Sequence, residues 1–206
     1  PPADPIGNES SPDKIKLGKV LYWDEQLSST KTVACGTCHI MSSGGTDTRS
    51  SSNNPNAINP GFDGLFDTED DIVGSPGVAQ TDSDGEYQMN PVYAYFSQVT
   101  SRKAPSVLNA GYSNSLFWDG RADDQLIDPI TNELILSSGA ALEVQVLGPL
   151  VSTSEMAHTG RSWQDIISSI EQSSPLALSP LASTELIDWI GNNSYYELFE
   201  MAFGST

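Results

Sequence analysis

The chain has 206 residues, enough for one domain, with 27 acidic and 9 basic residues and a net charge of −18. This charge repels polyanions, so it argues against nucleic acid and anionic membrane surfaces as partners and favours a basic protein partner or a salty environment. No apolar run approaches the roughly 20 residues that a membrane-spanning helix needs, so we expect no membrane span.

The first predicted helix begins at Pro12, with Ser11 as its N-cap, and its apolar face carries Leu17, Val20 and Leu21. Residues 42–91 are rich in Ser, Gly, Asn, Asp and Pro and show no regular apolar period, so they predict a long irregular segment. A second irregular stretch is predicted from residue 123 to residue 153.

The last quarter of the chain is predicted to be helical. Ser162 and Asp165 form a capping-box pattern before apolar residues at helical spacing, Trp163, Ile166, Ile167 and Ile170. A second helix is predicted over residues 184–190. A third ends at Gly204 and carries an aromatic stripe that we expect in the core, Tyr196, Phe199 and Phe203. Strand patterns are scarce, so the predicted fold class is all-α with long irregular loops.

The two cysteines of the chain stand three residues apart and are followed at once by a histidine, in Cys35-Gly-Thr-Cys38-His39. A redox dithiol needs a βαβ setting, and a structural zinc site needs a second pair of ligands; neither is visible. C-x-x-C-H is the attachment signal of c-type haem, whose vinyl groups react with the thiols while the histidine binds the iron. We therefore predict one covalent haem c with His39 as the proximal iron ligand. A disulfide or two free thiols would be the structural alternative.

The residue on the other side of the iron is left open. An electron carrier closes that position with Met or His, and the candidates are Met41, Met89, Met156, Met201 and His158. Met41 is too near His39 in sequence and Met201 is expected in the core, so Met89, in the long loop, and His158 are kept as possible ligands. None of the five is decisive. An enzyme keeps the position open and needs an acid that moves a proton between the peroxide oxygens. Because haem is attached outside the bacterial cytoplasm, we expect a periplasmic or exported protein.

Several segments together resemble the bacterial di-haem cytochrome c peroxidases and the related MauG-like enzymes. In chain order they are LGKVLYWDEQLSS, CGTCH, SGGTDTRS, RKAPSVLNAGYSNSLFWDGRAD, GPLVSTSEM and YYELFEMAFG. They span most of the chain. The resemblance implies that residues 1–206 are a single cytochrome c-like haem domain, similar to the N-terminal half that carries the peroxidatic haem. On this interpretation we expect the second haem domain of the family to lie outside these residues.

The resemblance also implies roles for individual residues. Glu155 is the expected distal acid that transfers the proton, and Trp118 is expected on the route toward a second haem. Arg102 and Arg121 lie in matching motifs and are candidates for holding the haem propionates. The structural alternatives are a solvated surface acid for Glu155, core packing for Trp118, and structural or surface roles for the two arginines.

The chain departs from the family pattern at some points. Between His39 and His158 there is no histidine, so the loop ligand of many resting enzymes is missing. Either the iron site is open, as in the MauG-like branch, or Met89 or His158 serves. An apolar insertion, NELILSSGAALEVQVLG, precedes the Glu-Met pair. The family also binds calcium, and DTEDD and TDSDGE are rich in carboxylates, although neither fits the EF-hand pattern.

We therefore expect an oxidoreductase that reduces hydrogen peroxide, with electrons from a second haem domain or a redox protein partner. Two alternatives are left open: a mono-haem c-type cytochrome that acts in electron transfer, and MauG-like oxidation of a protein substrate. An oligomer is compatible with each of them.

Overall fold

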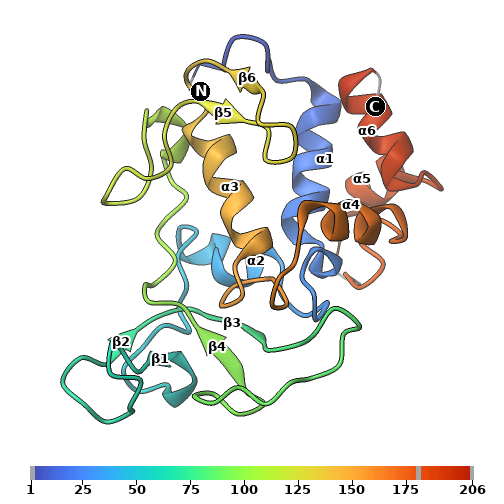
Figure 1. The fold of residues 1–206 in the computed structure, drawn as a ribbon. Helices are drawn as coiled ribbons and strands as arrows, with labels where there is room; N and C mark the ends of the chain where they lie inside the picture. The colour runs from blue at the N-terminus through green and yellow to red at the C-terminus, as the bar shows by residue number, and fades with distance from the viewer. Residues whose placement is uncertain (1–2, 180–181, 205–206) are drawn as a thin grey trace.

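The computed structural model describes residues 3–179 and 182–204 (Figure 1). These residues form six α-helices: α1 Pro12–Trp23, α2 Cys35–Cys38, α3 Ala141–Val151, α4 Trp163–Glu171, α5 Thr184–Ile190 and α6 Tyr195–Phe203. Short 3-10 turns are η1 Glu25–Leu27, η2 Met41–Ser43, η3 Pro55–Ala57 and η4 Ala110–Tyr112. None of the helices in this part of the chain has the length and apolar composition needed to cross a bilayer.

The described residues also form three antiparallel sheets of two strands each. The pairs are β1 Ile58–Asn59 with β2 Ile72–Val73, β3 Pro76–Ala79 with β4 Ser97–Val99, and β5 Leu126–Ile127 with β6 Leu134–Leu136. The all-α prediction was therefore wrong, because the fold is mixed. Strands of two to four residues are too short to show an alternating pattern, and they form because the loop backbone must satisfy its own hydrogen-bonding groups.

The predicted first helix is confirmed as α1. The Ser11 side chain accepts a hydrogen bond of 3.1 Å from the Lys14 backbone N–H, and Pro12 occupies the first turn, where its missing N–H costs nothing. Helix α1 lies beside α5 and α6 (Figure 1), and its Leu17 and Val20 share a buried cluster with residues of those two helices. This packing makes the principal core, whose buried residues are Leu17, Val20, Leu176, Leu186, Ile190, Tyr195, Leu198 and Ala202.

The three C-terminal helices are also confirmed. At the start of α4 the Ser162 N–H donates to Asp165 at 2.8 Å, and the Asp165 N–H donates back to the Ser162 hydroxyl at 3.2 Å. Helix α5 has the predicted bounds, and α6 ends at Gly204, whose φ of +81° suits glycine.

The buried face of α6 was predicted wrongly. Tyr196 and Phe203 are 57% and 53% exposed, and Phe199 is only partly buried. The buried residues are Tyr195, Leu198 and Ala202, which share the spacing of the predicted stripe but lie one residue earlier. Met201, expected in the core, is 43% exposed. Both stripes have helical spacing, so only packing against α1 decides between them.

Helix α3 lies inside the stretch that was predicted to be irregular. Its sequence, ALEVQVLGPLV, is apolar almost all round, so it lacks the alternation of polar and apolar faces that identifies a surface helix. Gly148 and Pro149 are also helix-breaking types, but they lie in its last turns. The same stretch contains the β5–β6 hairpin, so the prediction for residues 123–153 was wrong.

A buried carboxylate joins the end of α1 to the start of α6. Asp24, completely buried at the end of α1, accepts hydrogen bonds from the backbone N–H groups of Gln26 at 2.9 Å and Leu176 at 2.8 Å, and from the Tyr195 hydroxyl. Four donors in all, including the Gln26 amide, compensate the cost of burying it. A smaller core, Leu27, Val33, Val78 and Met156, lies next to this region and supports the candidate site.

Candidate functional site

The C-x-x-C-H motif forms the one-turn helix α2 and is held by the end of α1. A Cβ atom on Gly36 would lie 2.3 Å from the Trp23 ring, so only glycine allows this contact. The Tyr22 hydroxyl donates a hydrogen bond of 2.6 Å to the His39 carbonyl. Burial and the neighbouring cysteines raise the pKa of Tyr22 to about 12, so its hydroxyl keeps the proton that it donates.

His39 is oriented by two backbone carbonyls. Its Nδ1 lies 2.9 Å from the Gly45 oxygen and 3.1 Å from the Pro105 oxygen. Both partners are acceptors, so Nδ1 carries the proton and Nε2 keeps a lone pair that is able to bind a metal. Gly45 has a φ of +74°, and a Cβ there would lie 2.2 Å from Val107 Cγ2. The histidine therefore depends on a glycine for its position.

Cys35 and Cys38 are free thiols, and both are partly buried. Burial raises the pKa of Cys35 and raises that of Cys38 to about 11. Two unpaired thiols beside an imidazole whose Nδ1 is already hydrogen-bonded form a donor set that fits covalent haem.

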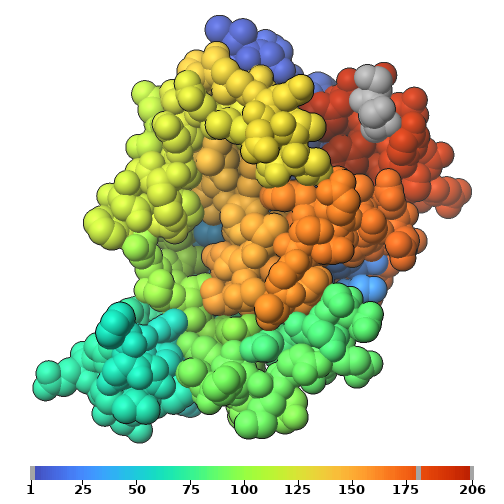
Figure 2. Space-filling view, in the orientation of Figure 1, coloured from blue at the N-terminus to red at the C-terminus, as the bar shows by residue number. Residues whose placement is uncertain are grey.

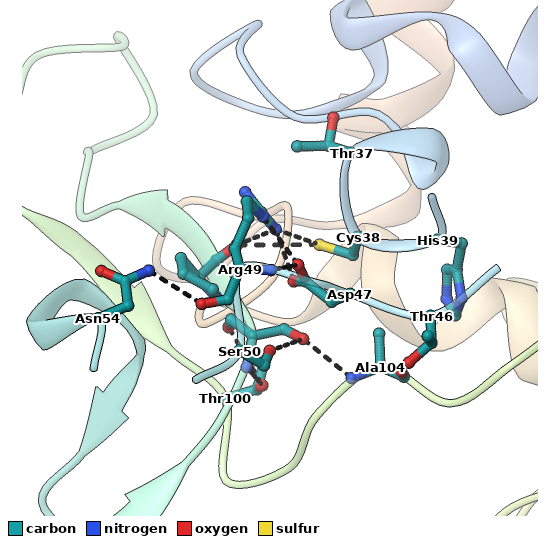
Figure 3. A network of polar contacts seen from close by, with 12 residues as sticks. Thr37, Cys38, His39, Thr46, Asp47, Arg49, Ser50, Asn54, Thr100 and Ala104 are labelled. Atoms are coloured by element: carbon teal, nitrogen blue, oxygen red, sulfur yellow. Dashed lines mark hydrogen bonds and ion pairs between the residues drawn. The ribbon is translucent and has the colours of Figure 1, made fainter. Parts of the chain in front are cut away.

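Arg49 and Asp47 form a network around Cys38 that sequence reasoning missed (Figure 3). Arg49 Nη2 lies 3.2 Å from Cys38 Sγ and 3.1 Å from the Pro76 carbonyl. Asp47 is completely buried and accepts from Arg49 Nη2 at 2.8 Å and Nε at 3.0 Å. Burial alone would raise the pKa of Asp47, but the hydrogen bonds and charge of Arg49 outweigh it and hold that pKa below its ordinary value. The available signal was the D-x-R spacing in SGGTDTRS.

Glu155 lies in the turn that follows α3, where its N–H donates to the Ser152 carbonyl at 3.1 Å. The next residue, Met156, is 3% exposed and anchors the turn in the smaller core. Its carbonyl accepts from Ser29 N–H at 2.8 Å and from the buried Arg161 at 3.2 Å. In the Glu-Met pair, Met156 therefore fixes the backbone from which Glu155 extends.

A cavity of about 270 Å³ lies beside Glu155. Its other lining residues come from the segment before β5 and from α3: Phe117, Arg121, Ala122, Val144, Gln145, Gly148 and Pro149. Figure 2 shows the surface hollowed between the yellow-green segment and α3. Sequence reasoning missed Gln145, because α3 was not predicted and its place on the cavity wall depends on that helix.

Strand β3 connects Glu155 with the cysteine motif. The carbonyl of Pro76 contacts Arg49 and lies 3.8 Å from Cys38 Sγ. The next residue, Gly77, packs on the other side against the turn of Glu155, where a Cβ would lie 2.1 Å from the Ser154 oxygen and 2.7 Å from Glu155 Cα. Two adjacent residues of one strand thus bring the C-x-x-C-H motif and Glu155 together.

The Phe-Trp-Asp-Gly-Arg motif lies on the surface. Trp118 is 81% exposed, which rules out the alternative of core packing. The Arg102 guanidinium lies 5.0 Å from the Trp118 ring centroid and 3.5 Å from Asp119. Arg121 pairs with Asp119 at 3.0 Å and stacks 3.5 Å over the Phe117 ring. The structure thus joins both arginines to Asp119, and their role toward haem propionates stays a prediction.

The two candidate distal ligands lie in different surroundings. Met89 is 67% exposed in the loop between β3 and β4. His158 is 8% exposed, and its Nδ1 lies 3.0 Å from the Thr159 carbonyl. Neither is among the residues that line the cavity, so a ligand role for either stays a prediction.

The carboxylates of the two acidic loops serve their own backbone. Asp70 Oδ2 accepts from the N–H groups of Phe62 and Asp63 at 2.6 and 3.1 Å, and Asp82 Oδ1 accepts from those of Asp84 and Glu86 at 3.0 Å each. Within residues 3–179 and 182–204 no three His, Cys, Asp or Glu side chains gather as a metal site. The prediction of calcium gains no support from these loops.

Comparison with known proteins decides the family. The family model described as di-haem cytochrome c peroxidase matches residues 12–206. This chain belongs to the di-haem cytochrome c peroxidase family. The predicted family is confirmed, and membership in it implies a haem cofactor.

Named relatives of this peroxidase-family chain agree with the assignment. The cytochrome c551 peroxidases of Nitrosomonas europaea and Pseudomonas aeruginosa are 27% and 29% identical to it, over 78% and 70% of its length. The methylamine utilization protein MauG of Methylophilus methylotrophus is 30% identical over 62%. The chain spans 31%, 31% and 27% of these relatives. A solved MauG-like protein associated with microbial copper homeostasis is 21% identical, with a TM-score of 0.47 over 98% of this chain and 38% of that one.

Proposed function

We propose that this chain is a peroxidatic haem unit. It binds one haem c covalently through Cys35 and Cys38, with His39 as the iron ligand, and reduces hydrogen peroxide with electrons from a second haem or a redox protein. Residues 1–206 form this single unit, which works in the periplasm or after export. The observation that supports it best is the connection through β3, which joins the thiol and imidazole donors to Glu155 and its cavity.

In this function a bound haem supplies the redox chemistry at the iron, and the chain places the groups around it. Donation from His39 Nδ1 to the carbonyls of Gly45 and Pro105 fixes the ring and makes Nε2 a stronger donor. Glu155 takes a proton on its carboxylate from one peroxide oxygen and delivers it to the other. Two electrons and two protons then convert hydrogen peroxide to two water molecules.

Other residues of the cavity assist this proton transfer. The Gln145 amide can donate a hydrogen bond to a peroxide oxygen that faces Glu155, and Phe117, Val144 and Pro149 supply an apolar part of the wall. In this proposal Trp118, which is 81% exposed and follows the cavity residue Phe117, lies on the route toward a second haem.

The test replaces Glu155 in the haem-loaded protein. We expect Glu155→Gln to lower peroxide turnover with a chemical electron donor by about 10²- to 10⁴-fold, the usual contribution of a general acid–base group, with covalent haem content unchanged. Glu171→Gln, at the end of α4, is the matched control and should keep full activity. Full activity of the Glu155 variant would remove this residue from the mechanism.

Optical spectra separate the peroxidase from its alternatives. A high-spin ferric spectrum that changes on adding peroxide or cyanide supports an open iron site. A low-spin spectrum indifferent to both supports a mono-haem electron carrier closed by Met89 or His158. Peroxide-dependent oxidation of a protein, with little turnover of small donors, would indicate MauG-like chemistry.

A further inference from the structure

Arg49 and Asp47 are a charged pair that peroxide chemistry at Glu155 does not require. Neither residue lines the cavity. The guanidinium nevertheless contacts the attachment residue directly, since Arg49 Nη2 lies 3.2 Å from Cys38 Sγ (Figure 3). The carboxylate of Asp47 contacts the guanidinium through two nitrogens, at 2.8 and 3.0 Å. Two opposite charges therefore lie at the point where the haem edge would be joined to the chain.

The pair is held rigidly. Asp47 is completely buried, and its Oδ1 also accepts from the Arg49 backbone N–H at 2.9 Å. Arg49 is also held outside its contacts with Asp47. Its Nη2 donates to the Pro76 carbonyl at 3.1 Å, and the Arg49 backbone carbonyl accepts from Asn54 Nδ2 at 2.9 Å. Charges held in this way cannot rearrange when the charge of a neighbouring group changes, so their field acts in full on that group.

We propose that Arg49 and Asp47 are positioning residues that set the reduction potential of the haem attached at Cys38. This inference rests on the proposed covalent haem. Ferric haem carries one more positive charge than ferrous haem. A neighbouring cation therefore favours the reduced form and raises the potential, and a neighbouring anion lowers it. As a pair the two charges largely compensate, so removing either one alone should move the potential, in opposite directions.

The experiment is a redox titration of the haem-loaded protein with mediators. We expect a lower midpoint potential for Arg49→Gln, a higher one for Asp47→Asn, and a value close to native for the double variant. A purely structural role would not give shifts of opposite sign that cancel. Asp128→Asn is the control, because Asp128 lies in the exposed β5–β6 turn and its carboxylate accepts from the N–H groups of Ile130 and Thr131 in the same turn. The midpoint potential of this variant should equal the native one.

Arg49→Gln leaves Asp47 buried without its partner and can fail to fold. In that case Asp47→Asn and the double variant are the test, since the midpoint potential of Asp47→Asn must be higher than that of both the double variant and the native protein. Three results would overturn this inference alone, in protein that carries covalent haem. They are variants whose midpoint potentials equal the native one, single variants whose potentials shift in the same direction, and an equal shift of the potential in Asp128→Asn. Absence of covalent haem from the native protein after export and maturation would overturn the proposed function, and this inference with it.

Discussion

Gly45 is the residue on which the orientation of His39 depends most directly. Gly45→Ala adds a Cβ at a φ of +74° that would lie 2.2 Å from Val107 Cγ2, so the backbone must move the carbonyl that accepts from His39 Nδ1. We expect a loss of roughly 2–4 kcal/mol of unfolding free energy, from strain plus overpacking, and an altered haem absorption spectrum. Thermal unfolding and optical spectroscopy measure the two effects.

Gly85→Ala is the matched control for this change. Gly85 has a similar φ of +84°, but no heavy atom lies within 4 Å of the added Cβ. It should show only the smaller cost of the backbone conformation, about 1–2 kcal/mol, and an unchanged spectrum. Equal losses in both variants would contradict a special role for Gly45.

Tyr22 gives a prediction that depends on pH. Its hydroxyl donates to the His39 carbonyl, and its pKa is raised from about 10 to about 12 in the folded protein. A raised pKa stabilises the fold while the group is protonated, so this contribution is complete below pH 10 and is lost as the pH rises toward 12. We expect the unfolding free energy of Tyr22→Phe to be roughly 0.5–1.5 kcal/mol lower than that of the native protein near pH 8. This difference should shrink above pH 10. A constant difference would contradict the proton assignment.

At the scale of elements, α6 tests which of two stripes is buried. Leu198→Ala removes a side chain that is 0% exposed against α1, so we expect a loss of about 2–5 kcal/mol in urea unfolding. Tyr196→Ala, at a position 57% exposed, should cost less than about 1 kcal/mol. A larger loss of unfolding free energy in Tyr196→Ala than in Leu198→Ala would instead make the aromatic stripe of Tyr196, Phe199 and Phe203 the core face.

Whether an element could be predicted depended on local signals. Ser11 and Ser162 precede helices α1 and α4, and their side chains cap the first turn, so neighbouring residues were sufficient to identify these helices. Helix α3 has no side-chain cap at Ala140 and is apolar on most sides. Only Ala141 of this helix is buried, and Leu142 and Val146 are 40% and 49% exposed, so neither a cap nor an amphipathic pattern marks the helix in the sequence.

At the scale of the whole molecule, the charge of −18 predicts how electrons arrive. A basic protein donor should be attracted at low ionic strength and lose this advantage as salt screens the charges. We expect kcat/KM with such a donor to fall at least about tenfold between roughly 10 mM and 500 mM salt. Turnover with a small neutral donor is the control and should change little. A rate with the basic donor that is flat or rises with salt would contradict this expectation.

The sequence by itself determined what depends on covalent neighbours: the two thiols beside His39, the capped helices, the net charge and the family. The tertiary structure decided what depends on residues brought together from distant segments. Cys38 meets the Pro76 carbonyl, and Gly77 meets the turn of Glu155, because β3 passes between them. Gln145 reaches the cavity only because α3 forms, and Arg102 and Arg121 pair with Asp119 because that loop folds back on itself. The physical reason is that such contacts come from packing and burial across the whole chain, which local propensities do not contain.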